Sequence, residues 1–143
     1  MTPGLLVNID VDDLARAEAF YTRAFGLRAA RRFGDDGVEL VGACVPLYLL
    51  RKPAGSIASD APATSRGLVR DYARHWTPVH LDFVVDDLDA ALARAQAAGA
   101  VREGDTRDAA WGRLALLADP FGHGLCLLQF HGRGYDEIAT SIA

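Results

Sequence analysis

The side chains best suited to chemistry in this chain are a histidine and an aspartate two positions apart, His80 and Asp82. They flank Leu81 in an apolar run that ends at Val85, which predicts a strand. Alternate residues of a strand face the same side, so His80 and Asp82 share one face. A histidine beside a carboxylate can act as a general base, ligate a metal or anchor a ligand, with the carboxylate fixing the imidazole tautomer. The same pair is also compatible with a structural role in which both only satisfy nearby backbone groups.

A second group of residues suits ligand binding better than catalysis; its members are Asn8, Tyr48, Trp111 and Cys126. Strand alternation places Asn8, Tyr48 and Cys126 on the faces that correspond to that of His80 and Asp82. Each also has an ordinary structural interpretation. Asn8 is typical of a side chain that pairs with a backbone group, and Cys126 of a small buried apolar residue. Tyr48 is typical of a cavity wall, and Trp111 of a cover for a sheet edge.

Two copies of one pattern position these residues. A strand over residues 7–11 precedes a helix between Asp13 and Gly26, and a strand over residues 81–85 precedes a helix between Asp87 and Gly99. Aspartate accepts hydrogen bonds from the first N–H groups of a helix, and glycine suits the residue just past its end. Further strands are expected after each helix, over residues 38–41, 46–50, 113–117 and 125–130.

The repeat predicts one domain over residues 1–143. It comprises a first module over residues 4–52, a connector over 53–77, a second module over 78–131 and a tail over 132–143. Part of the connector, around residues 67–75, can be interpreted as a short helix.

Composition excludes several classes of function. The 15 basic and 19 acidic residues give a net charge of −4, which argues against a nucleic-acid binder. No apolar run approaches the roughly 18 residues of a membrane span, so we expect no membrane partner. Two cysteines make no disulfide framework, which favours a cytoplasmic location.

The repeated pattern resembles the vicinal oxygen chelate superfamily, which includes glyoxalase I, bleomycin and fosfomycin resistance proteins, and extradiol dioxygenases. The matching residues include Asp13-Leu14, Phe20-Tyr21 and Phe25-Gly26-Leu27 in the first half, and Asp119-Pro120-Phe121-Gly122 in the second. The resemblance implies an α+β fold of two paired βαβββ modules, whose curled mixed sheets enclose a concave pocket.

The resemblance also implies four positions at which members of the superfamily hold a metal. In this chain these positions are Leu6, Tyr48, His80 and Cys126. Leucine cannot ligate a metal, and the set has no carboxylate, which hard divalent ions prefer. We therefore expect no cofactor, with a divalent metal at His80 as the less favoured alternative.

Two functions follow from the resemblance. One is a glyoxalase- or bleomycin-resistance-like protein that binds a small, partly apolar molecule in the pocket between its modules without the full metal site. The other is a metal-dependent lyase, isomerase or dioxygenase that uses His80. Whether the protein is an enzyme stays open between them. The resemblance further implies a homodimer, because the sheet edges of small paired modules need cover.

Overall fold

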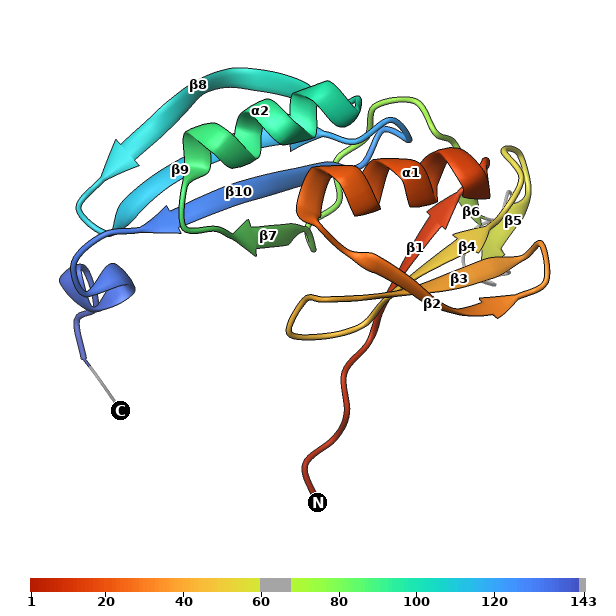
Figure 1. Cartoon of the computed structure of the whole chain (residues 1–143), viewed down its shortest axis with the longest axis horizontal. Helices are drawn as coiled ribbons and strands as arrows, with labels where there is room; N and C mark the ends of the chain where they lie inside the picture. The colour runs from red at the N-terminus through yellow and green to blue at the C-terminus, as the bar shows by residue number, and fades with distance from the viewer. Residues whose placement is uncertain (60–67, 142–143) are drawn as a thin grey trace. The chain divides into compact units, whose positions relative to one another are not determined.

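Each half of the chain builds a four-stranded mixed sheet with one helix packed on it (Figure 1). The structure is a computed structural model and describes residues 1–59 and 68–141. Its contacts divide the chain into two compact units, Met1–Ala73 and Arg74–Ala143. The α+β class and the repeated modules predicted from the sequence are confirmed.

The first unit contains β1 and α1, the strands β2, β3 and β4, and a small hairpin of β5 and β6. Their bounds are β1 Val7–Val11, α1 Leu14–Phe25, β2 Arg28–Phe33, β3 Gly37–Val41, β4 Leu47–Arg51, β5 Ile57–Ser59 and β6 Leu68–Val69. The four-stranded sheet has the order β1-β4-β3-β2, in which only the β1–β4 pair is parallel. The short helix expected around residues 67–75 is a wrong prediction for the described residues, because Leu68 and Val69 form β6.

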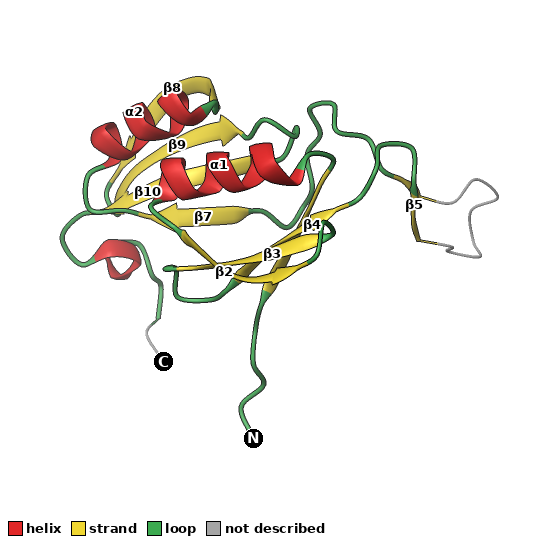
Figure 2. Cartoon of the chain, turned by 45° about the vertical axis from the view of Figure 1, so that its right-hand side comes forward, coloured by secondary structure: helices red, strands yellow, loops and turns green. Residues whose placement is uncertain are grey.

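The second unit repeats this order. Its elements are β7 Leu81–Val84, α2 Leu88–Ala98, β8 Val101–Ala109, β9 Gly112–Ala118, β10 Gly124–Phe130 and the 3₁₀ turn η1 Gly134–Glu137. The sheet order is β7-β10-β9-β8, with β7 and β10 parallel. Figure 2 shows α2 lying along one face of this sheet. Among the described residues, no helix is both long enough and apolar enough to cross a membrane.

Both helices begin and end as their capping residues predict. The carboxylate of Asp13 accepts a hydrogen bond of 3.0 Å from the backbone of Arg16, and that of Asp87 accepts one of the same length from Ala90. Gly26, at φ +66°, ends α1 in the left-handed conformation that glycine adopts without strain. The capping aspartates therefore fix where each helix leaves its sheet.

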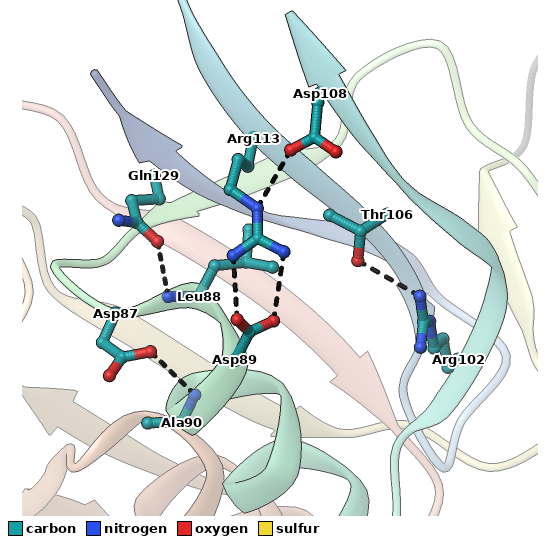
Figure 3. Close-up of polar contacts among 9 residues, drawn as sticks. All are labelled: Asp87, Leu88, Asp89, Ala90, Arg102, Thr106, Asp108, Arg113 and Gln129. Carbon is teal, nitrogen blue, oxygen red and sulfur yellow. Dashed lines mark hydrogen bonds and ion pairs between the residues drawn. The ribbon is translucent and has the colours of Figure 1, made fainter. Parts of the chain in front are cut away.

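Polar side chains of the sheet hold the first turn of α2 (Figure 3). Gln129 on β10 accepts a hydrogen bond of 2.8 Å from the backbone N–H of Leu88. Arg113 on β9 donates to both carboxylate oxygens of Asp89, at 2.9 and 3.2 Å, and its Nε donates to Asp108 at 3.1 Å. These contacts anchor α2 on one face of the sheet and so define the opposite face.

Apolar residues of each helix pack on one face of its sheet and form a core there. The buried set of the first unit includes Val11, Phe20, Tyr21, Val38, Leu40 and Leu49. That of the second unit includes Leu88, Leu92, Leu117, Phe121, Leu125 and Leu127. Because strand residues alternate, the residues between these core positions lie on the face turned away from the helix, here called the distal face. The candidate site residues of the strands lie on the distal faces.

Candidate functional site

The strand register aligns the candidate residues across each sheet. In the first unit Asn8 pairs with Tyr48, and Tyr48 pairs with Glu39 on β3. In the second unit Asp82 pairs with Cys126, and the row continues through Leu116 to Glu103 on β8. Paired residues share a face, so each row lies on the distal face of its sheet. The pairing of Asn8 with Tyr48 in the first unit thus matches the pairing of Asp82 with Cys126 in the second.

His80, Asp82 and Cys126 form the most chemically capable group in the second unit. Nε2 of His80 lies 3.2 Å from Oδ1 of Asp82, and each of these side chains is 31% exposed. The ligating atoms of all three residues lie within 4.8 Å of one another. Both members of the polar pair can therefore reach a bound molecule, while Cys126, the register partner of Asp82 on β10, is buried.

Cys126 is a protonated, buried thiol at neutral pH. The residue is only 3% exposed. Burial, together with the charge of Asp82 and a hydrogen bond to its carboxylate, raises the pKa of the thiol to about 12. A thiol must lose its proton to act as a nucleophile or metal ligand. In this environment Cys126 acts as an apolar side chain, next to Leu116 and Leu128 on the same face of the sheet.

An exposed tryptophan lies against His80 and adds an aromatic surface to the site. The ring centroids of Trp76 and His80 are 4.9 Å apart with a tilt of 38°, and Trp76 is 53% exposed. The guanidinium carbon of Arg74 lies 6.0 Å from the centroid of the Trp76 ring. The same guanidinium donates hydrogen bonds of 2.5 and 2.8 Å to Glu103. Trp76 was not among the predicted site residues. The signal in the sequence is its place where the connector meets the second module, which suits either a lid or a packed anchor.

In the first unit the structure reveals an ion pair around Tyr48 that sequence reasoning missed. Glu39 is buried on the distal face. Its carboxylate binds Arg31 and the Tyr48 hydroxyl. Asn8 and Leu6 are both exposed. Alternation along β3, where Val38 and Leu40 are core residues, would have placed Glu39 on the face of Tyr48.

Trp111 lies away from the polar pair. It sits in the turn between β8 and β9, and its carbonyl accepts a hydrogen bond of 2.9 Å from the backbone of His131, just past the end of β10. Its ring packs against Tyr135 of η1 at 5.6 Å. Because Cys126 is near the start of β10, Trp111 lies about 16 Å along the strand from it. A role for Trp111 in ligand binding stays a prediction.

The residues at the four metal positions of the superfamily do not fit the complete site. Leu6 has no ligating atom, and the Tyr48 hydroxyl is held between Glu39 and Arg31. His80 and Cys126 remain, with Asp82 as a third donor from outside the four positions. The high pKa of the Cys126 thiol opposes the deprotonation that metal binding requires. We therefore derive no reaction through a metal.

Comparison with known proteins agrees with this architecture. The family model described as a glyoxalase-like domain matches residues 6–128. An uncharacterized protein of Mycobacterium bovis is 33% identical over 148 residues, covering 99% of this chain and 93% of that protein.

Two solved structures are similar across nearly the whole chain. The fosfomycin resistance protein FosX of Listeria monocytogenes has a TM-score of 0.69 at 18% identity and covers 97% of this chain and 100% of its own. TnmS3, an antibiotic binding protein from a Streptomyces species, has a TM-score of 0.61 at 25% identity, with 92% and 98% covered.

Proposed function

Because this chain belongs to the glyoxalase-like domain family, we propose that it binds a small, partly apolar molecule against the distal face of its second sheet. The observation that carries the proposal is the pairing of His80 with Asp82 beside the exposed ring of Trp76. A few polar groups at the end of an apolar surface are the usual composition of a small-molecule site. The likeness to TnmS3, an antibiotic binding protein, supports binding without a required reaction.

In the proposed complex, His80 hydrogen-bonds a carbonyl or hydroxyl group of the ligand. Asp82, 3.2 Å away, orients the imidazole. Trp76 stacks on the apolar part of the ligand, and Leu116 and Cys126 form the floor. This arrangement binds and orients a molecule, and no bond needs to be made or broken.

The alternative is a metal-dependent lyase, isomerase or dioxygenase that uses His80. The observation in its favour is the close approach of the donor atoms of His80, Asp82 and Cys126. Elemental analysis of protein purified without a tag or chelator separates the two functions, with metal reconstitution as the control. A stoichiometric divalent metal would favour the enzyme.

The test of the binding proposal is His80→Ala, assayed with a ligand selected from a library of small aromatic amides and alcohols. A Trp111→Phe background leaves Trp76 as the only tryptophan, so its fluorescence reports binding beside His80. Loss of a ligand hydrogen bond should weaken affinity by about 1–3 kcal/mol, or roughly 5- to 150-fold. The melting temperature should change little, because the His80–Asp82 pair is partly exposed and such pairs contribute at most about 1 kcal/mol.

His131→Ala is the matched control, since His131 is an exposed histidine past the far end of β10. It should leave ligand affinity unchanged. Unchanged affinity in a well-folded His80→Ala protein would remove His80 from the site.

A further inference from the structure

A fixed arginine on the first sheet points to a binding site built from residues of the first unit. Arg31, Glu39 and Tyr48 come from the neighbouring strands β2, β3 and β4. Between Ala29 and Arg32 the register of β2 against β3 shifts by one residue. An extra residue in one strand re-aims a side chain, and here Arg31 is brought over Glu39.

The guanidinium of Arg31 and the hydroxyl of Tyr48 both hydrogen-bond the buried carboxylate of Glu39. Nε of Arg31 lies 3.1 Å from both carboxylate oxygens of Glu39, and Nη2 lies 2.5 Å from Oε2. The Tyr48 hydroxyl donates to the same Oε2 at 2.5 Å and accepts from Nη2 at 2.7 Å. Hydrogen bonds from Arg31 and then Tyr48 lower the pKa of Glu39 to about 2, so its carboxylate stays charged and holds the guanidinium in place.

The other end of the guanidinium faces solvent. The side chain of Glu39 is 9% exposed, whereas that of Arg31 is 68% exposed. Nη1 of Arg31 makes no hydrogen bond within the part of the chain that the structure describes. The buried carboxylate of Glu39 thus holds the two N–H donors of Nη1 in a fixed orientation. A ligand that binds them loses less side-chain entropy than one that must order a mobile arginine.

Three largely apolar side chains lie on the same face of the sheet and are here called the ledge: Phe33, Tyr48 and Leu50. The rings of Phe33 and Tyr48 have centroids 6.0 Å apart at a tilt of 33°, and Phe33 is 47% exposed. A Cβ placed on Gly37 would lie 3.3 Å from Cδ2 of Leu50 and 3.5 Å from Cδ2 of Phe33. The glycine therefore leaves room for the Leu50 side chain to pack close against β3, beside the Phe33 ring.

We propose that Arg31 and the ledge of Phe33, Tyr48 and Leu50 bind a planar aromatic carboxylate. The carboxylate accepts hydrogen bonds from Nη1 of Arg31, and the ring of the ligand lies against Phe33. This goes beyond the binding proposed at His80, because it assigns other residues, all of the first unit, and a charged ligand class. Arg32, the next residue, provides the contrast: both its terminal nitrogens are taken by Glu18 of α1, at 2.7 and 2.8 Å.

The test compares 2-naphthoate with 2-naphthamide, two probes of nearly equal size that differ in charge, by isothermal titration calorimetry. A charge-assisted hydrogen bond to a partly exposed arginine should make the wild-type protein prefer naphthoate by about fivefold or more. Arg31→Gln should reduce this preference to within about twofold, and Phe33→Ala should weaken both probes alike. If the ion pair is only structural, the wild type will bind both probes equally or neither at millimolar concentration, and the proposal fails.

Two further variants keep the test decisive. Removing Arg31 alone leaves the Glu39 carboxylate without its cation, so Arg31→Gln combined with Glu39→Gln provides a variant with no stranded charge. It should fold and also lose the preference. Arg32→Gln removes a neighbouring surface arginine of the same kind and should retain the preference in full. Retention of the preference in both Arg31 variants, or its loss in Arg32→Gln, would overturn the assignment.

Discussion

The thiol of Cys126 should resist alkylation in the folded protein. At pH 8 a thiol with a pKa of about 12 is ionised to roughly one part in 10⁴, whereas a thiol with the ordinary pKa of about 8.5 is roughly one-quarter ionised. Because the thiolate is the reactive species, ionisation alone should slow Cys126 by about a thousandfold or more. Its 3% exposure slows the reaction further.

The assay is a time course with iodoacetamide at pH 8, followed by intact mass and peptide mapping. Cys44 is exposed and should be labelled first, which gives one adduct per native chain and two in denaturant. In a Cys44→Ser variant the folded protein should acquire almost no label. Between pH 8 and 10 the slow rate at Cys126 should rise about tenfold per pH unit.

If Cys126 in folded Cys44→Ser protein reacts within about tenfold of the rate at Cys44, the thiol is neither buried nor protonated as described. It would then be available as a nucleophile or a metal ligand, and the argument against a metal at His80 and Cys126 would fail.

Two other predictions concern the first unit and the assembly. Since the folded pKa of Glu39 is lowered from 4.5 to about 2, the contribution of its carboxylate to stability is complete above pH 4.5 and is lost as the pH falls towards 2. Urea unfolding at several pH values should show this loss of stability, and the loss should be smaller in Glu39→Gln. Identical pH profiles for the wild type and the variant would contradict the prediction. We also expect a homodimer, because the edge strand β2 is exposed along its whole length. A light-scattering mass that stays near 15.3 kDa at high concentration would exclude the dimer.

The sequence predicted the inner elements of the fold well, because their patterns are strong. β1 and β7 have apolar residues at alternate positions, and α1 and α2 lie between an aspartate cap and a glycine. The edge strands β2 and β8 were not found from their residues. Arg28–Phe33 and Val101–Ala109 are mostly polar and exposed, so they carry no alternation, and their pairing depends on neighbours distant in the sequence.

The candidate site was predictable only in part. Strand alternation was sufficient to bring Asp82 and Cys126 to one face, since both lie on regular strands. The Arg31–Glu39 pair depends on a bulge in β2, and the contact of Trp76 with His80 depends on how an irregular segment approaches β7. Neither feature has a periodic pattern, so both had to come from the structure.

The most direct test of the central claim is ¹H–¹⁵N NMR of metal-free, EDTA-treated protein titrated with a selected aromatic amide or alcohol. We predict saturable shifts of the amide resonances of Asp82, Leu116 and Cys126 and of the Trp76 indole, with no dependence on added Zn²⁺. Binding that appears only after Zn²⁺ is added, or shifts that leave all four resonances unchanged, would contradict the proposal that these residues bind a small molecule without a metal.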